Sequence, residues 1–398
     1  MDINYKWILN HESIIKKFEN ENQPVVFVSL NRVKDNLKVL RRCLDKTGCK
    51  HKIYYALKSN YNKPIIDALQ QEKIDGLEVI SKLEYGLARD AGFDEKKIVF
   101  NGIFRDKDLL NNSLKNKNIV NIDSFQELYN LPSNAKIGIR IHPEFTEDGN
   151  FVKKGSKLGF NEDDITQVLA KAKENKIAIS GISFHIFSNN LSAELTKKAI
   201  KRTLQIIDRV EKEQGRKLDY IDIGGGLKPR IFYKDEALEN YIEEITVDIK
   251  NKKPYLTIIL EPGRFLVSDA VFILSNVKGI KKNQDKHWAI LDISTNYLIP
   301  ATGSNFLVLP YKKRVSEGIK IHFADRICSP AGTIDTNNRF DEITEKDKVI
   351  VANAGAYTTV MKEQFVFFDP THAFIQDGKV IKIIKQKNKE YVKKYHYW

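Results

Sequence analysis

Cysteine is scarce in this chain. The 398 residues include three cysteines, Cys43, Cys49 and Cys328, and no two of them stand at the spacing of a CxxC pair or of another metal-ligand motif. A disulfide scaffold is therefore not expected, and neither is a cysteine-bound metal. Three isolated cysteines instead fit a reducing, cytoplasmic setting.

Long apolar runs are also missing. No uninterrupted apolar stretch approaches the roughly 18 residues that a membrane-spanning helix needs. The first 22 residues, MDINYKWILNHESIIKKFENEN, carry charges throughout and contain no apolar core of signal-peptide length. The content of 42% hydrophobic and 29% charged residues is that of an ordinary globular protein. We therefore expect no membrane partner.

The net charge of +13 is the one unusual bulk property. A charge of this size is compatible with nucleic acid, an anionic partner or an acidic substrate. However, the lysines are spread along the whole chain, and no short basic block is interleaved with aromatic residues. We therefore do not expect nucleic-acid binding, whereas an anionic substrate stays open.

Helical and strand-like segments alternate from residue 31 onwards, beginning with an amphipathic helix at 31–46. The strand-like segments are 53–59, 76–81, 97–102, 118–124, 136–143, 181–188, 220–226 and 257–263. Eight strands separated by helices over roughly 230 residues have the expected size of a closed (β/α)8 barrel. An open, doubly wound sheet is the alternative, but the unbroken alternation favours closure.

After about residue 267 the pattern changes to strands without intervening helices. These strands are expected at 270–280, 287–294, 318–327, 347–357 and 373–386. The sequence therefore predicts an α/β chain with a TIM-type barrel at 31–266 and an all-β domain at 267–398. The N-terminal segment 1–30, with its strand-like 23–30, is expected to join the β-domain.

Residues that carry chemistry stand where the predicted barrel strands end. In a barrel of this kind the active site lies at the carboxyl ends of the strands. A lysine, a histidine, carboxylates, an arginine and a glycine run are expected at that face: Lys58, Glu78, Asn101, Asp123, Arg140, His142, His185, Ser188, Gly224–Gly226 and Glu261–Arg264.

Each of these residues also has an ordinary interpretation. A lysine at a strand end usually reaches solvent, a single histidine is usually a core residue, and a glycine run is commonly a tight turn. Glycine backbone N–H groups, however, approach a phosphate closely, and an arginine beside them adds complementary charge. Phosphate, lysine and carboxylate together suggest a phosphorylated aldehyde cofactor held as a Schiff base.

Seven motifs, in order along nearly the whole chain, carry a family resemblance: YYALKSN, GLEVISKLE, SKLGF, FHIFSN, DIGGGL, EPGR and ANAGAY. The chain resembles the fold-type III enzymes dependent on pyridoxal 5'-phosphate (PLP), which share the alanine racemase-like fold. Within them it resembles the diaminopimelate/ornithine decarboxylase group. The resemblance implies a small amino-acid-type substrate and a homodimer whose active sites are shared between subunits.

The resemblance also implies roles for individual residues. Lys58 is implied to hold PLP covalently until the substrate's amino group displaces it. His185 is implied to lie against the cofactor ring, with Ser188 near its phosphate. The other implied phosphate-site residues are Gly224, Gly225, Gly226, Gly263, Arg264 and Tyr357.

Glu261 is the residue that favours decarboxylation. A carboxylate against the pyridine nitrogen keeps that nitrogen protonated, so the ring is a strong electron sink when CO2 leaves. Racemases of this fold generally place an arginine there, which weakens the sink. Glu78 and Glu84 of GLEVISKLE match further acidic positions of the family.

The chain departs from the family in two segments. Phe187 stands where FHIGS has glycine, and the family's cysteine loop becomes RICSPAGTID. Aligning that loop on its proline puts Gly332 at the cysteine position, so Cys328 serves as catalytic cysteine only if the loop is shifted. The acidic residue that reads a distal amino group is missing. Asp335 remains as a structural or dimer-contact residue or, with Arg140, as part of the substrate site.

These departures define the expected function. We expect decarboxylation of an L-amino acid or conjugate with an anionic distal part, as in siderophore (citryl-diamino acid) biosynthesis. The alternatives are decarboxylation of diaminopimelate, ornithine or lysine, and a catalytically inactive PLP-binding regulator. Retention of Lys58, His185, Glu261 and Tyr357 argues against the regulator, because a pure binding protein does not need a cofactor site.

Overall fold

The chain folds into two compact units. The computed structural model describes residues 5–103, 105, 107–143, 156–186, 188–189, 192–299, 306–312, 315–330, 332–340, 342–362, 366–367 and 369–385. The barrel unit comprises Asn36–Lys228 and Tyr233–Phe265. The β-unit comprises Met1–Asp35, Pro229–Phe232 and Leu266–Trp398.

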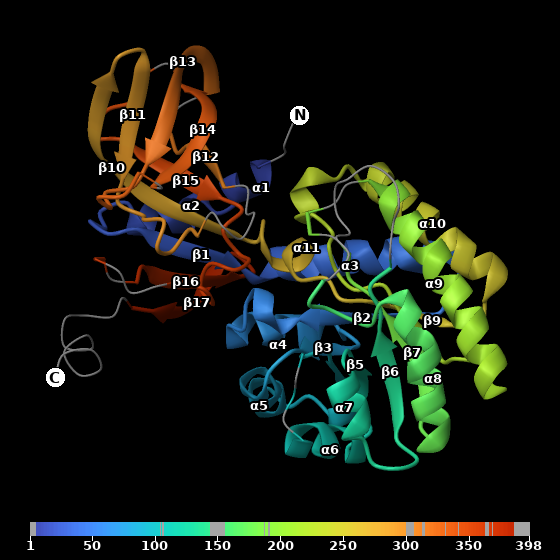
Figure 1. Cartoon of the computed structure of the whole chain (residues 1–398). Helices are drawn as coiled ribbons and strands as arrows, with labels where there is room; N and C mark the ends of the chain where they lie inside the picture. The colour runs from blue at the N-terminus through green and yellow to red at the C-terminus, as the bar shows by residue number, and fades with distance from the viewer. Residues whose placement is uncertain are drawn as a thin grey trace. The chain divides into compact units, whose positions relative to one another are not determined.

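The barrel unit contains the predicted closed sheet of eight parallel strands (Figure 1). The strands are β2 (His51–Ala56), β3 (Gly76–Val79), β4 (Ile98–Phe100), β5 (Ile119–Ile122), β6 (Lys136–Arg140), β7 (Ala178–Ser183), β8 (Tyr220–Asp222) and β9 (Thr257–Leu260). Closure is made by β9 and β2, which pair from His51 opposite Ile258 to Ile53 opposite Leu260. The prediction of a barrel is confirmed, and the open sheet is wrong.

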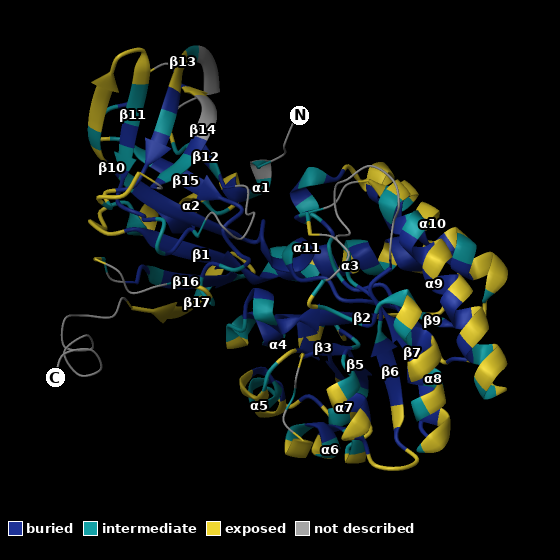
Figure 2. Cartoon of the chain, in the orientation of Figure 1, coloured by how far each residue is buried: buried dark blue, intermediate teal, exposed yellow. Residues whose placement is uncertain are grey.

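One helix precedes the first barrel strand, and further helices follow the strands around the barrel. They are α3 (Leu30–Thr47), α4 (Lys63–Gln71), α5 (Lys82–Asp90), α6 (Lys107–Lys115), α7 (Phe125–Tyr129), α8 (Ile165–Glu174), α9 (Ala193–Gln214), α10 (Asp235–Lys252) and α11 (Arg264–Val267). Short 3-10 turns lie at η2 (Leu57–Ser59), η3 (Glu95–Lys97), η4 (Glu162–Asp164) and η5 (Arg230–Phe232). In α9 the buried residues Ile200, Leu204 and Ile207 recur at helical spacing, while its opposite face is exposed (Figure 2).

Two tyrosines fill the barrel interior against glycines. A Cβ atom at Gly76 would lie 2.6 Å from the ring of Tyr54, and one at Gly181 would lie 2.3 Å from the ring of Tyr220. The two rings pack with Val99 and Ile259 as one buried cluster. The glycines in these strands are therefore explained by close packing, since only a residue without a side chain leaves room for the rings.

The β-unit is built on one mixed sheet in the order β14-β13-β11-β10-β1-β16-β17, with β15 pairing β10 and β12. Its elements are α1 (Lys6–Leu9), α2 (Glu12–Ile15), η1 (Lys16–Phe18), β1 (Val25–Ser29), β10 (Val271–Asn283), β11 (Lys286–Leu291), β12 (Leu307–Pro310), β13 (Val315–Ala324), β14 (Thr333–Phe340), β15 (Lys348–Ala352), β16 (Thr371–Gln376) and β17 (Lys379–Ile384). Strand β1 lies between β10 and β16, and Phe27 stacks on Phe272 with ring centroids 5.1 Å apart. The β-domain therefore takes in the N-terminal segment, as predicted.

The structure corrects several predicted strands. Strands β12 and β14 were not expected, and the single strand predicted at 373–386 is the hairpin of β16 and β17, which turns at Asp377 and Gly378 with positive φ. Strand β7 ends at Ser183, so the prediction that it reaches residue 188 is wrong. Lys58 lies in the η2 turn rather than in a strand.

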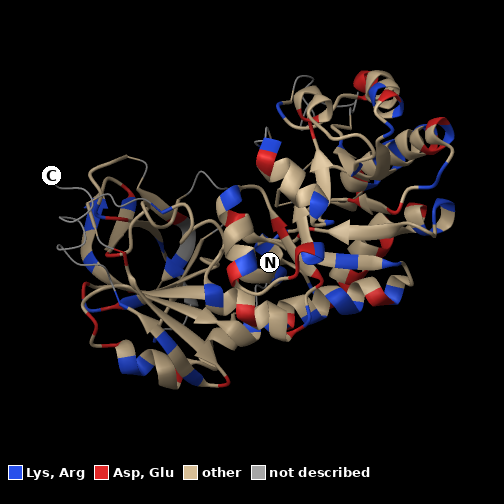
Figure 3. Ribbon diagram, turned by 90° about the horizontal axis from the view of Figure 1, so that it is seen from below, with Lys and Arg blue, Asp and Glu red and all other residues tan. Residues whose placement is uncertain are grey.

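Charges of both signs are interspersed along the helices and strands (Figure 3). Several form exposed pairs one helical turn apart, such as Lys63 with Asp67 at 2.7 Å. Exposed pairs of this kind contribute little to stability. Within the part of the chain that the structure describes, no helix is long and apolar enough to cross a membrane.

Candidate active site

Lys58 is paired with a buried carboxylate. The η2 turn directly after β2 places the Lys58 Nζ atom 2.9 Å from Oε1 and 2.8 Å from Oε2 of Glu78. Glu78 belongs to the neighbouring strand β3 and is 1% exposed. A buried carboxylate needs such a partner, because an isolated charge in the barrel would be costly. The ordinary interpretation of Lys58 as a lysine reaching only solvent is wrong.

Local hydrogen bonds hold the turn that carries Lys58. The Ser59 hydroxyl donates to the Ala56 carbonyl oxygen at 2.8 Å, and the Tyr55 hydroxyl donates to the Asn60 carbonyl oxygen at 2.8 Å. On the other side of the turn, a Cβ atom at Gly263 would lie 2.9 Å from Cβ of Ser59. The turn after β9 therefore packs directly against the turn that carries Lys58, and Arg264 begins α11 at this place.

Glu261 follows β9 and is one of two carboxyl groups buried side by side. Its side chain is hydrogen-bonded to that of Asp222, and burial together with the charges of Asp222 and Glu78 raises the pKa of Glu261 well above its usual range. Burial also raises the pKa of Asp222, to about 6. Of the two carboxyl groups, Glu261 has the more strongly raised pKa, so it holds a proton more readily than Asp222.

His185 follows β7 and is half-buried. Burial, and to a smaller extent the charges of Lys58 and Arg140, lowers the pKa of His185 to about 3. The imidazole is therefore neutral at physiological pH, which suits a ring that stacks on an aromatic cofactor. Arg140, the last residue of β6, and Lys58 thus lie on the same side of the barrel as His185.

The glycine run after β8 forms a turn that side chains cannot enter. Gly224 and Gly226 have φ values of 69° and 99°, a region that favours glycine. A Cβ atom at Gly225 would lie 2.5 Å from the Glu261 carbonyl oxygen. The turn is fixed by Asp222 Oδ1, which accepts from the Gly224 backbone N–H at 2.9 Å. It is a bare backbone surface beside Glu261.

The other predicted residues have varied surroundings. Ser188 is exposed, and Phe187 lies outside the described residues. In the β-unit, Tyr357 is half-buried with φ of 60°, and Cys328 is an exposed free cysteine between β13 and β14. Asp335 lies in β14, where its Oδ2 accepts from the Val308 backbone N–H at 3.0 Å.

Gly332 is held in place by a buried carboxylate. Asp325 accepts from the backbone N–H groups of Thr295 and Ile327 at 2.7 and 3.0 Å. A Cβ atom at Gly332 would lie 2.2 Å from Asp325 Oδ1, so a cysteine there requires Asp325 to move. The loop is therefore built around glycine at this position.

Sequence reasoning missed the polar residues inside the barrel. Glu78 was placed at a strand end without a partner, and Asn121, Asp222 and Tyr220 were not considered as site residues. The available signal was a polar residue within a short apolar strand, as in GLEV, IVNI and YID. Strands buried on both faces are normally continuous apolar runs, so such an interruption marks a polar site.

Comparison with known proteins shows which enzyme family the chain belongs to. The family described as "Pyridoxal-dependent decarboxylase, pyridoxal binding domain" matches residues 30–268, which is more than half of the chain. The chain belongs to the pyridoxal-dependent decarboxylases. Its cofactor is therefore PLP, and it is a PLP-dependent carboxy-lyase.

Individual relatives cover nearly the whole chain. Diaminopimelate decarboxylase of Methanothermobacter thermautotrophicus is 29% identical over 90% of this chain and 87% of its own. The structure of diaminopimelate decarboxylase from Helicobacter pylori in complex with L-lysine matches with a TM-score of 0.83 and 24% identity, over 96% of this chain and 98% of that one. The arginine decarboxylase of Paramecium bursaria Chlorella virus matches with a TM-score of 0.79 and 22% identity, over 92% and 100%.

The barrel residues of this decarboxylase fit PLP. The glycine turn Gly224–Gly226 offers a phosphate a bare backbone, because a Cβ atom at its centre would collide with the chain. Lys58 would supply the amine, His185 a neutral ring, and Glu261 a carboxyl group for the ring nitrogen. The roles themselves remain predictions.

Gly225→Ala is expected to weaken PLP binding at least about tenfold and to destabilise the protein by about 1–3 kcal/mol. The reason is the collision of the new methyl group with the Glu261 carbonyl oxygen, which forces the turn to shift. Gly86→Ala is the matched control: a Cβ atom there meets nothing within 4 Å, and alanine within α5 should stabilise by about 0.5–1 kcal/mol. Cofactor titration and thermal unfolding measure both effects. Equal PLP affinity in the two variants would contradict the assignment of the turn.

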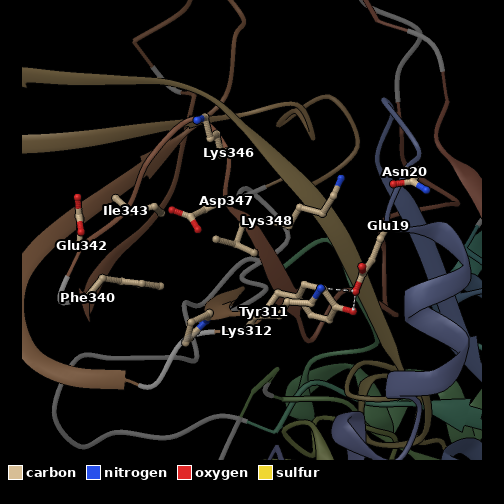
Figure 4. A pocket seen from close by; sticks show the side chains of 12 residues that line it. Glu19, Asn20, Tyr311, Lys312, Phe340, Glu342, Ile343, Lys346, Asp347 and Lys348 are labelled. Carbon is tan, nitrogen blue, oxygen red and sulfur yellow. Dashed lines mark hydrogen bonds and ion pairs between the residues drawn. The ribbon is translucent and has the colours of Figure 1, made fainter.

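A cavity in the β-unit lies between Glu19 and the segment that includes Tyr311, Lys312 and Lys348 (Figure 4). Its volume is about 250 Å³. Tyr311 and Lys312 both bind the Glu19 carboxylate there, at 2.5 and 2.8 Å. Because these charges are already satisfied by one another, we assign no chemistry to this cavity.

Proposed function

We propose that this decarboxylase acts on diaminopimelate. The support comes from its relatives: those matching over most of the chain are named diaminopimelate decarboxylases, from archaea, bacteria and a plant. The fold alone does not choose a substrate, because arginine and lysine decarboxylases share it at similar TM-scores. The proposal replaces the siderophore-type conjugate as the first candidate.

The proposed reaction uses the barrel residues as follows. When bound, PLP accepts the electron pair that is left as the bond from Cα to the carboxylate breaks. Glu78 holds Lys58 at the barrel mouth until the cofactor takes up its amine, so the amine is already placed for attachment. His185 packs as a neutral ring and brings no charge to the site. Arg140, on the same side of the barrel, is proposed to bind the substrate's carboxylate.

The buried carboxyl group of Glu261 is the observation that best supports decarboxylation. Its carboxyl group is buried at 8% exposure, and burial together with the charges of Asp222 and Glu78 raises its pKa well above the usual range. A protonated ring nitrogen strengthens electron withdrawal from Cα, which decarboxylation requires. An arginine at this position would weaken it, so Glu261 disfavours racemisation.

A conjugate with an anionic distal part remains the second candidate. The observation that favours it is the loop between β13 and β14, where Gly332 is locked against Asp325 and the family's cysteine has no place. Cys328 is the proposed substitute for that cysteine, with Asp335 near the substrate. A loop altered in this way is expected to change how the distal end of the substrate is read.

An activity panel separates these candidates. The purified protein, loaded with PLP, is tested for CO2 release from meso-diaminopimelate, ornithine, lysine, arginine and a citryl-diamino acid conjugate. We expect meso-diaminopimelate to give the highest kcat/KM, by at least about tenfold. Preference for the citryl conjugate would transfer the proposal to the second candidate. Full PLP loading without CO2 release from any substrate would identify a regulator instead.

We further propose that the protein is a cytoplasmic homodimer. The family resemblance supports the dimer, with the segment that holds Cys328 and Asp335 contributing to the partner's site. The three cysteines, none of which forms a disulfide, fit a reducing compartment. Sedimentation velocity with and without PLP tests the dimer, and a monomer under both conditions would rule it out.

A further inference from the structure

A row of polar side chains leads through the barrel interior to Glu261. The Tyr220 hydroxyl donates to Asn121 Oδ1 at 2.6 Å, and Asn121 Nδ2 donates to Asn101 Oδ1 at 2.8 Å. Asn101 Nδ2 then donates to Glu261 Oε1 at 2.5 Å. These four residues come from β8, from β5, and from the ends of β4 and β9, and they form a continuous chain of hydrogen bonds.

The direction of this chain is fixed by Asp222. Asp222 Oδ1 already accepts from the Gly224 backbone N–H, and Oδ2 accepts from Asn121 Nδ2 at 3.2 Å. The amide nitrogen of Asn121 must therefore face the carboxylate, and its oxygen must face Tyr220. With Asn121 oriented, Asn101 receives a hydrogen bond on its oxygen and presents its NH2 group to Glu261.

Room for this row inside the barrel comes from Gly138 in β6, which has no side chain. A Cβ atom at Gly138 would lie 2.1 Å from the Tyr220 hydroxyl and 2.0 Å from Asn121 Oδ1. Asn121 is 0% exposed, and Asn101 is 7% exposed. Barrel interiors are normally filled by branched apolar side chains, and burying polar groups is unfavourable unless every one is hydrogen-bonded. A buried polar row whose members are all hydrogen-bonded is rigid and fixes the orientation of each side chain in it.

We propose that Asn101 is a positioning residue for Glu261, and that Asn121 and Tyr220 hold Asn101 in its donating orientation. Asn101 donates to Oε1 of Glu261, and Asp222 is hydrogen-bonded to the same carboxyl group, so that group is held from two sides where it would meet the cofactor's ring nitrogen. This inference rests on the proposed contact between Glu261 and that nitrogen. If so, the Tyr220 hydroxyl, which reaches Glu261 only through Asn121 and Asn101, influences how strongly the cofactor ring withdraws electrons.

Tyr220→Phe is the primary test, because it removes the hydroxyl and keeps the ring that fills the barrel. We expect kcat to fall about tenfold with KM unchanged. This is the change in rate expected when one hydrogen bond that supports the transition state is lost. In PLP labelled isotopically at the ring nitrogen, the NMR signal of the bound cofactor should move toward the unprotonated form. Tyr241→Phe is the control: Tyr241 is also buried and its hydroxyl lies 3.2 Å from that of Thr196, away from the row.

A double-mutant cycle separates a positioning row from general packing. Asn101→Ala should lower kcat more than Tyr220→Phe, and Tyr220→Phe should have no further effect on kcat in the Asn101→Ala protein. Additive effects, or an NMR signal in Tyr220→Phe equal to that of Tyr241→Phe, would overturn the inference. If Glu261→Gln also leaves the nitrogen signal unchanged, the proposed contact of Glu261 has failed instead.

Discussion

Lys58→Ala is expected to abolish covalent attachment of PLP and to lower decarboxylation by about 10²–10⁴-fold or more, the loss typical of a reacting group. Alanine has no amine for the cofactor's aldehyde, so the visible absorption of the bound, borohydride-reducible cofactor should disappear. Lys63→Ala is the matched control, since Lys63 is exposed at the start of α4 and, within the described part of the chain, forms its ion pair with Asp67. Absorption spectra and CO2 release measure both variants.

The same substitution leaves Glu78 buried without its cation. Breaking a buried ion pair from one side costs about 3–5 kcal/mol, and less is expected here because the Lys58 side chain is 36% exposed. Lys58→Arg keeps the charge beside Glu78 without a reactive amine, so it should fold normally and remain inactive. An active Lys58→Arg protein would refute the role of Lys58, whereas an unfolded Lys58→Ala protein alone would not.

The barrel was predictable because its signal is repeated. Each parallel strand is a short apolar run such as KIVF or TIILE, and each is followed by a helix whose buried face recurs every three to four residues. Eight repeats over one stretch of chain leave little choice of topology. The position of Lys58 at the strand ends follows from that count alone.

Strand limits were less predictable because they depend on the neighbouring strand. The apolar segment GISFHIFS favours a strand as far as residue 188, but β8 is only three residues long. The last ladder pair joins Ser183 to Asp222, and the last backbone hydrogen bond on that side runs from the Phe184 N–H to the Asp222 carbonyl oxygen at 2.9 Å. His185 therefore lies in the loop, where the charges of Lys58 and Arg140 act on its ring.

Strands β12 and β14 escaped prediction for a related reason. Strand β14 ends the sheet, and its sequence TIDTNNRF has no apolar alternation, because an edge strand does not need two buried faces. Strand β12 is four residues long and ends at Pro310, which is typical of a strand with one partner. Propensity does not reveal strands that are stabilised mainly by the neighbour's backbone.

The partners of Glu261 were hidden because they are far apart in sequence. Asn101 and Glu261 are separated by 160 residues, and Asn121 and Asp222 by 101. A sequence shows that a polar residue interrupts a strand, and only closure of the barrel shows which of them meet. The same is true of Glu78, whose role becomes visible only with Lys58 beside it.

Glu261→Gln is expected to change activity and stability in opposite directions. Activity should fall about 10²–10³-fold, as for other single electrostatic groups, since a neutral amide does not keep the ring nitrogen protonated. The protein without PLP should become more stable at pH 8, because the variant no longer buries a group that tends to ionise there. The introduced amide is also a hydrogen-bond donor to Asp222.

The direction of the predicted stability change follows from the pH dependence of unfolding. The pKa of Glu261 is raised in the folded protein, and that of Asp222 is raised to about 6, so the folded state keeps protons that the unfolded chain releases. Their stability contribution is complete below the ordinary carboxyl range and is lost as pH rises through the folded pKa values. Wild-type protein free of PLP should therefore lose stability from about pH 4 upwards, and the slope should be smaller in Glu261→Gln.

Glu84→Gln is the control for a buried carboxyl group outside the pair of Glu261 and Asp222. Burial raises the pKa of Glu84 to about 6, so its replacement should also flatten the stability profile. Glu84 Oε2, however, accepts from the Ile80 backbone N–H, and the Glu84 backbone N–H is capped by Ser81, which gives this residue a structural role at the start of α5. Its replacement should leave kcat within about threefold of wild type.

A large loss of activity in both variants, or an unchanged stability profile in Glu261→Gln, would show that Glu261 is not the protonated group at the centre of the site. Loss of activity in Glu261→Gln alone, together with its gain in stability at high pH, is the combination expected of a carboxyl group retained for chemistry at a cost in folding free energy.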